Sequence, residues 1–152
     1  MTLHPPFLLG LAILAHGPAF ADEYIVDDQD GAPGFVTTGD DWDTWGSAGH
    51  GFDGSDSSFH YLTHTLGGSD RRGTATWQPT LSRAGTWQID TWFRRTENRT
   101  RDANHVIIDG LGSETWRVID QYGEDVGGSP SGWISLGEYW CEEGFGGCIV
   151  TL

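Results

Sequence analysis

Trp92 stands among the side-chain types that sugar recognition uses. In "QIDTWFR" it lies between Asp90 and Arg94, and an extended strand would place all three side chains on one face, because successive residues point to opposite sides. An indole offers an apolar face to sugar C–H groups, and charged neighbours can bond the hydroxyls. We predict that these residues bind a ligand; the alternative is a second-layer tryptophan covered by a neighbouring loop.

A second group consists of Trp42, Asp43 and Trp45 in the Gly-rich stretch "GDDWDTWGSAGHGF". Loops of this composition often carry binding residues, because a rigid scaffold presents them at the surface. We therefore predict ligand contact here too. The competing interpretation is that the two tryptophans fold over the end of the domain.

Arginines gather in "FRRTENRTRDANH" on an otherwise acidic chain. Guanidinium groups that converge could hold the carboxylate of an acidic sugar through paired hydrogen bonds. Arg94, Arg95 and Arg99 are therefore candidate ligand-binding residues. The alternative is that such arginines pair with the protein's own acids.

Acidic turns raise the question of calcium. The turn "DDQDG" brings Asp27, Asp28 and Asp30 together, and carboxylate oxygens are suitable ligands for Ca2+. An EF-hand is excluded, because two loop positions that need carboxylates hold other residues when Gly31 is aligned as the loop glycine. A calcium site of another type remains a hypothesis beside solvated turn carboxylates.

The charge balance limits the partners. The formal net charge is −14, with 22 acidic residues against 8 basic ones. Such a surface repels nucleic acid and anionic lipid. We expect no nucleic acid and no membrane insertion, and we expect a polysaccharide or a cell-surface glycan as the partner.

The first 21 residues have the pattern of a secretory signal peptide. An apolar run is followed by the helix-breaking pair "GP" and then by "AFA", a small-x-small cleavage pattern, before Asp22. The run is too short to span a bilayer as a helix, and no Lys or Arg precedes it. We predict a signal peptide at 1–21, a single domain at 22–152, and a secreted protein, extracellular or periplasmic; the alternatives are a misassigned start codon and a retained anchor.

The elements that must position these side chains are strands. The predicted mature chain has 21 glycines (23 in all, less Gly10 and Gly17) and no convincing helical periodicity. Short β-branched and aromatic runs alternate instead with turn residues. We predict an all-β antiparallel β-sandwich of jelly-roll or galactose-binding-like type, with strands at 24–27, 59–65, 73–78, 85–94, 105–109, 115–120, 133–140 and 148–152.

The same alternation predicts the core. On the strand from 85 to 94, the face opposite Trp92 is expected to be buried, and its residues are Trp87, Ile89, Thr91 and Phe93. Trp77 shares the apolar face of its own strand with Ala75, so we expect both in the core.

Cys141 and Cys148 are the two cysteines of the chain. In an oxidising compartment we expect them to form a disulfide that crosses the two arms of a tight C-terminal hairpin. Closing so short a loop stabilises the fold by roughly 2–3 kcal/mol on the chain-entropy model. A structural staple is favoured over a redox or metal role.

Several short motifs follow one another along the chain: "ATWQP", "AGTW", "NRTRDA", "GWISLGEYW" and the closing "GCIVTL". In this order they resemble the golvesin C-terminal-like domain, a family that includes the carbohydrate-binding-like domain of xanthan lyases. The resemblance covers about residues 27–152, and Cys141 departs from it by replacing an aromatic residue. It implies an extracellular β-sandwich associated with glycan binding, and it carries over no catalytic residue.

Two functions follow from these observations. The first is a secreted, noncatalytic polysaccharide-binding module that acts as a stand-alone domain. The alternative is a structural or adhesive cell-envelope protein that binds other proteins through the same sandwich, and buried tryptophans would favour it. An enzyme is not expected, because candidate carboxylate pairs such as Glu142 and Glu143 are adjacent on a predicted hairpin tip and point apart, and no Gly-x-Ser-x-Gly nucleophile motif occurs.

Overall fold

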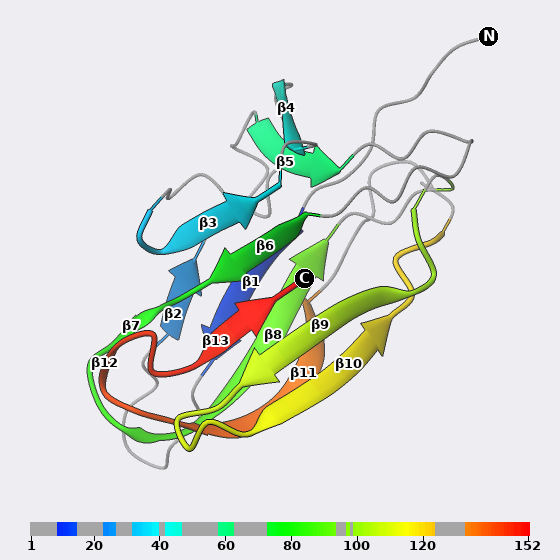
Figure 1. Ribbon diagram of the computed structural model, residues 1–152. Helices are drawn as coiled ribbons and strands as arrows, with labels where there is room; N and C mark the ends of the chain where they lie inside the picture. The colour runs from blue at the N-terminus through cyan, green and yellow to red at the C-terminus, as the bar shows by residue number, and fades with distance from the viewer. Residues whose placement is uncertain are drawn as a thin grey trace, which may run out of the picture.

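The computed structural model describes residues 9–14, 23–26, 32–39, 42–46, 58–62, 73–93, 97, 99–123 and 133–152, with the backbone alone for 9–14, 42–46 and 58–62. These segments form thirteen strands and no helix (Figure 1). The strands are β1 Leu9–Leu14, β2 Glu23–Val26, β3 Phe35–Thr38, β4 Trp42–Gly46, β5 Ser58–Leu62, β6 Thr74–Trp77, β7 Thr80–Leu81, β8 Gly85–Phe93, β9 Ala103–Ile108, β10 Glu114–Ile119, β11 Trp133–Cys141, β12 Gly144–Phe145 and β13 Ile149–Thr151.

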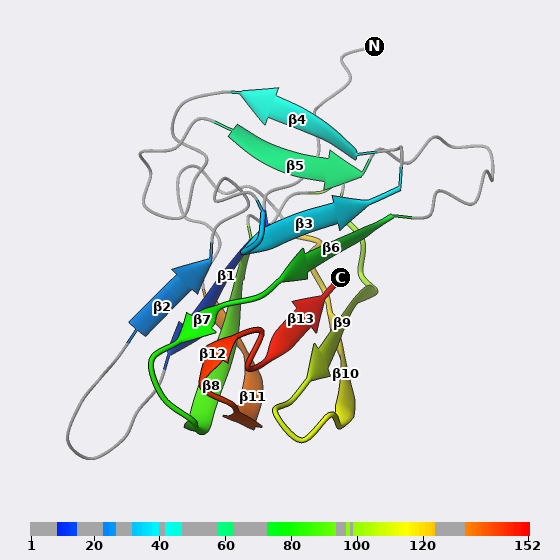
Figure 2. The same cartoon turned by 60° about the vertical axis from the view of Figure 1, so that its left-hand side comes forward.

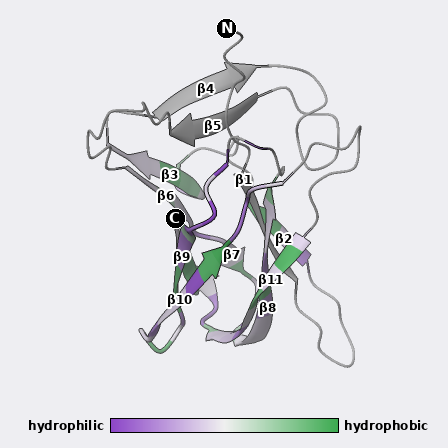
Figure 3. Cartoon of the chain, turned by 90° about the vertical axis from the view of Figure 1, so that its right-hand side faces the viewer, coloured by the Kyte–Doolittle hydropathy of each residue, from purple (hydrophilic) through white to green (hydrophobic). Residues whose placement is uncertain are grey.

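Two sheets form the body of the molecule. A four-stranded sheet has the order β11-β8-β1-β2, and a five-stranded sheet has the order β10-β9-β13-β6-β3. The two sheets lie face to face as separate layers (Figures 2 and 3). Their strand pairs are antiparallel, so the predicted all-β antiparallel sandwich is confirmed. Two smaller pairs, β12 with β7 and β4 with β5, complete the described strands.

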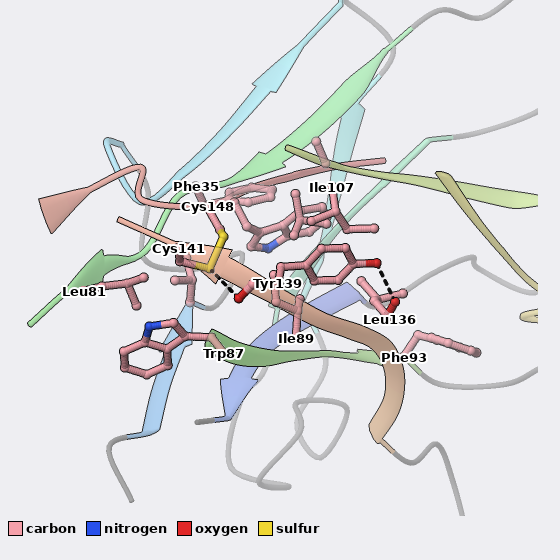
Figure 4. Close-up of a cluster of buried hydrophobic side chains, with 14 residues drawn as sticks. Phe35, Leu81, Trp87, Ile89, Phe93, Ile107, Leu136, Tyr139, Cys141 and Cys148 are labelled. Carbon is pink, nitrogen blue, oxygen red and sulfur yellow. Dashed lines mark hydrogen bonds between the residues drawn. A yellow bond between two sulfur atoms is a disulfide. The ribbon is translucent and has the colours of Figure 1, made fainter. Parts of the chain in front are cut away.

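The core lies between the two layers, where the inner faces of the strands meet (Figure 4). On β8 the predicted inner face is buried, and its members are Trp87, Ile89, Thr91 and Phe93. Trp77 and Ala75 are buried on β6, as predicted. Removing a buried aromatic ring of this kind costs about 3–5 kcal/mol, because the cavity adds to the lost transfer energy.

The predicted disulfide between Cys141 and Cys148 is confirmed. The turn that it closes is also held by the Glu142 N–H, which donates to the Gly147 carbonyl at 3.0 Å. Cys141 ends β11 in the four-stranded sheet, whereas Cys148 directly precedes β13 in the five-stranded sheet. The bond therefore also joins the two sheets, which the sequence did not predict.

Further contacts between the layers lie along the side where β10 and β11 run. The Arg117 Nε–H on β10 donates to the Leu136 carbonyl on β11 at 2.8 Å. In the β9–β10 turn, the Gly110 N–H donates to the Trp140 carbonyl at 2.7 Å. A Cβ at Gly110 would stand 2.7 Å from the Glu142 nitrogen, so this close approach needs glycine. The sheets are thus fixed to each other at β10 and β11.

β1 falls within the segment that we predict to be a signal peptide. In the full chain its backbone pairs with both β8 and β2. Cleavage after Ala21 stays a prediction. If it occurs, β2 and β8 lose the strand between them and must pair directly or leave two sheet edges open.

Candidate functional site

A β-bulge in β11 decides which tryptophans share a face. Trp133 and Trp140 are seven residues apart, so strict alternation would place them on opposite sides of the sheet. The pairing with β8 shifts register between Ser135 and Gly137, which inserts one extra residue into β11. Both indoles therefore lie on the outer face of the four-stranded sheet.

Gly137 makes this bulge feasible. Its φ of +126° is a conformation that L side chains rarely adopt. The Tyr139 hydroxyl donates to the Leu136 carbonyl at 2.7 Å from the core side, and the Gly137 N–H donates to the Ser135 hydroxyl at 3.2 Å. The bulge is thus held from both sides of the sheet.

The outward residues of β8 and β11 form one surface, which we call the β8–β11 outer face. Its members are Thr86, Gln88, Asp90, Trp92, Trp133, Ser135, Glu138 and Trp140. Trp140 pairs across the strands with Thr86, and Trp133 pairs with Trp92. The two exposed indoles are six β8 residues apart, or roughly 20 Å at the rise of an extended strand.

Polar groups lie between the two tryptophans. Glu138 stands opposite Gln88, and Ser135 stands opposite Asp90. The Gln88 amide nitrogen donates to both Asp90 carboxylate oxygens, at 3.0 and 3.1 Å. The Glu138 side chain is exposed. The arrangement places hydrogen-bonding groups between two apolar platforms.

Trp92 and Asp90 do share the outer face, as alternation predicts. Trp92 is however only 8% exposed and Asp90 only 6% exposed, whereas Trp133 is 38% and Trp140 45% exposed. The burial of Trp92 agrees with the alternative of a covered second-layer tryptophan. Stacking surface on this face is therefore provided by the two β11 tryptophans. Arg94, the third member of the predicted group, lies outside the described residues.

The arginine cluster is only partly described. Arg95, like Arg94, lies outside the described residues, and Arg99 is buried. Arg101 approaches Asp120 at 3.3 Å and stacks over the Tyr122 ring at 3.8 Å from its centroid. This arginine pairs with an acid of the protein itself.

The other predicted site residues are placed in part. Trp42, Asp43 and Trp45 belong to β4, which pairs with β5, so their backbone is a strand and not the expected loop. Their side chains lie outside the described residues, as do Asp27, Asp28 and Asp30. In the part of the chain that is described, no three His, Cys, Asp or Glu side chains gather as a metal site.

Neither Trp133 nor Trp140 was among the predicted site residues. The signal for Trp140 was present, because Tyr139 and Cys141 alternate with it. The signal for Trp133 required knowledge of the bulge, since plain alternation groups it with the core residues Tyr139 and Cys141.

His105 is a buried titratable group away from this face. Its Nδ1 lies 3.2 Å from the Ala103 carbonyl, and the side chain is almost inaccessible on β9. Burial lowers the pKa of His105 to about 4, and the hydrogen bond with Ala103 opposes this shift. The imidazole is therefore neutral near pH 7 and takes no part in a solvent-facing site.

Comparison with known proteins gives one match. A model of the Golvesin C-terminal domain matches residues 24–151, in agreement with the resemblance found in the motifs. No curated protein and no solved structure gave a match. The described segments contain no helix that could cross a membrane.

Proposed function

Because the chain belongs to the Golvesin C-terminal domain family, we propose that it is a noncatalytic module that binds polysaccharide on the β8–β11 outer face. The observation that carries this proposal is the β11 bulge, which turns Trp133 and Trp140 to the same side. Both indoles are accessible, and each offers a ring face on which a sugar can stack. Residues between them can bond hydroxyl groups.

The spacing of the platforms favours an extended ligand. A separation of roughly 20 Å exceeds the size of a single sugar ring, so one monosaccharide cannot contact both indoles. A polysaccharide chain laid along β11 would stack at Trp133 and at Trp140 and pass Glu138 between them. We therefore propose a chain of several sugar units as the ligand.

The charges of the face favour a neutral or amino-bearing polysaccharide. Among its described members, Asp90 and Glu138 carry the charge, and both are acidic. The Asp90 carboxylate already accepts two hydrogen bonds from Gln88, which leaves Glu138 as the exposed charge. An acidic sugar would be repelled here and by the net charge of −14.

We place this module outside the cytoplasm. The signal-peptide pattern of residues 1–21 and the Cys141–Cys148 disulfide both suit an oxidising compartment. No cofactor takes part in the proposed contacts. Calcium at Asp27, Asp28 and Asp30 stays a separate hypothesis, which binding assays with and without chelator would test.

The experiment that tests the proposal compares matched tryptophan variants by affinity electrophoresis in gels that contain neutral polysaccharides. Trp133→Ala and Trp140→Ala should each reduce retardation about tenfold, and Trp140→Phe should restore most of it. Phe145→Ala removes an aromatic ring that is 50% exposed on β12, away from the face, and should bind normally.

The opposite result would favour the structural or adhesive alternative. If Trp133→Ala and Trp140→Ala remain folded by circular dichroism and bind every polysaccharide like the unmodified protein, the face is not a glycan site. Absence of any polysaccharide binding would also contradict the proposal. A protein-binding role would then be the better account of the exposed aromatic residues.

A further inference from the structure

An unbroken row of outward side chains crosses the five-stranded sheet on the far side of the sandwich. Trp116 on β10 is opposite Val106 on β9, which is opposite Thr151 on β13. Thr151 is opposite Thr76 on β6, and Thr76 is opposite Val36 on β3. These five residues define the five-strand outer face.

The row points away from the core. Neighbouring residues of the same strands face inward and are buried, namely Phe35, Trp77, Ile107 and Val150. Trp116 is 61% exposed, the most exposed of the described tryptophans. Figure 3 shows the two sheets as separate layers, so their outer faces point in opposite directions.

Threonine hydroxyls form one pair within the row and a second pair next to it. The Thr76 and Thr151 hydroxyl oxygens lie 3.2 Å apart, and those of Thr38 and Thr74 lie 2.7 Å apart on the neighbouring rung. A hydroxyl that takes part in one such bond still has lone pairs to accept another. The sheet thus presents hydroxyl groups in register beside an accessible indole.

The charge of this face limits its ligand. Among the described residues of the five strands, Glu114 at the start of β10 is the one charged side chain that shares the face. A surface with so little charge does not repel an uncharged, hydroxyl-rich partner, and the net charge of −14 disfavours an anionic one. Stacking on Trp116 and bonding to threonine hydroxyls are contacts that a neutral sugar chain can make.

We propose that the five-strand outer face is a second site for neutral polysaccharide, and that the module cross-bridges two polysaccharide chains. The inference rests on the proposed function, because it takes the ligand class from the β8–β11 outer face. The two faces belong to opposite layers of the sandwich. One extended chain lying along either face therefore leaves the other face open for a second chain.

A bridging assay tests this inference. Beads that carry a neutral polysaccharide are incubated with the full chain, washed, and then offered the same polysaccharide in fluorescent, soluble form. The unmodified protein should hold fluorescent polymer on the beads. Trp116→Ala should still bind the beads through the β8–β11 outer face but capture roughly tenfold less fluorescent polymer.

A second variant tests the same face in case Trp116→Ala does not fold. Thr76→Val with Thr151→Val removes two hydroxyls while keeping the shape and strand preference of the side chains, and it should also lower capture. Phe145→Ala, another exposed aromatic off both faces, should capture normally. Light scattering without polysaccharide measures whether the protein associates with itself.

The outcomes separate the two proposals. If Trp116→Ala captures fluorescent polymer fully, the second site is overturned while the first stands. If, in a Trp116→Ala background, Trp133→Ala with Trp140→Ala binds the beads as well as Trp116→Ala alone, the function proposed for the β8–β11 outer face is wrong, and so is the two-face arrangement. Dimers that depend on Trp116 would make this face a protein interface and overturn the inference.

Discussion

The two outer faces of the sandwich both carry exposed tryptophan, but they differ in the number of indoles and in the residues beside them. Both face away from one shared core. The β8–β11 outer face has two indoles about 20 Å apart with an amide and carboxylates between them. The five-strand outer face has one indole at its edge, followed by valine and threonine in register.

The two faces differ in the backbone geometry that turns their tryptophans outward. The five-strand outer face follows plain alternation, so strand parity alone places its residues outward. The β8–β11 outer face needs an irregularity, because only the bulge at Gly137 turns Trp133 outward. The β8–β11 outer face therefore depends on one glycine, because Gly137 adopts the positive φ that the bulge requires.

Acid should weaken the layer beneath the five-strand outer face. His105 on β9 has a pKa of about 4 in the folded state against 6.5 in the unfolded state, so unfolding takes up a proton as pH falls. The contribution of His105 is complete above pH 6.5 and is lost as pH falls toward 4, up to about 3 kcal/mol.

Urea unfolding of the unmodified protein and of His105→Gln measures this effect. The pH dependence of the free energy of unfolding should be shallower in the variant between pH 6.5 and 4. Parallel curves for the two proteins would show that His105 does not carry the dependence. Hydrogen exchange in β9 and β8 would then show which layer loosens first.

Loss of the disulfide should lower the stability of the fold and leave binding at both faces unchanged. Cys141→Ala with Cys148→Ala removes the covalent link between the sheets and should lower the free energy of unfolding by roughly 2–3 kcal/mol. Calorimetry measures the change in melting temperature. Because neither cysteine lies on an outer face, polysaccharide affinity below the melting temperature should be unchanged, and a loss at only one face would contradict this.

Substitution of Gly137 should separate the faces. Gly137→Ala puts a Cβ 3.1 Å from the Tyr139 hydroxyl at a φ of +126°, and should destabilise the fold by about 1–3 kcal/mol. As the bulge shifts, binding at the β8–β11 outer face should fall while binding through Trp116 persists. A matched control is Gly112→Ala, also at positive φ but in the β9–β10 turn with nothing near its Cβ.

The smallest change in affinity is expected when a charge is removed from the β8–β11 outer face. Glu138→Gln should leave the affinity for neutral polysaccharide within about 0.5–1 kcal/mol and should raise the affinity for carboxylated polysaccharide, because one exposed negative charge is removed. Isothermal titration with both polymers at low salt measures this. Unchanged discrimination between them would remove Glu138 from the ligand path.

The sequence predicted the fold through its regular parts. Alternation identified the buried face of β8 and placed Trp77 inside. The eight predicted strands are present with ends shifted by a few residues. Five of the described strands were missed, namely β1, β3, β4, β7 and β12. β1 lies in the predicted signal peptide, and the other four are runs of two to five residues, which carry little periodic signal.

The candidate site was harder to predict from the alternation of residues than the fold was. Alternation states which face Trp92 occupies but not what covers that face, and the ring proved buried. A bulge reverses the parity of every residue beyond it, so plain alternation would assign Trp133 to the core side of β11. The assignment of Cys141 and Cys148 to different sheets likewise depends on strand order, which local pattern does not determine.

The most direct test follows the eight tryptophan indole N–H signals by nitrogen-15 NMR during titration with a neutral oligosaccharide series. We predict that the signals of Trp133 and Trp140 shift first, that oligosaccharides long enough to reach both bind tightest, and that buried Trp77 and Trp87 stay unchanged. Saturable shifts that spare both Trp133 and Trp140, or no shift with any glycan, would contradict the account.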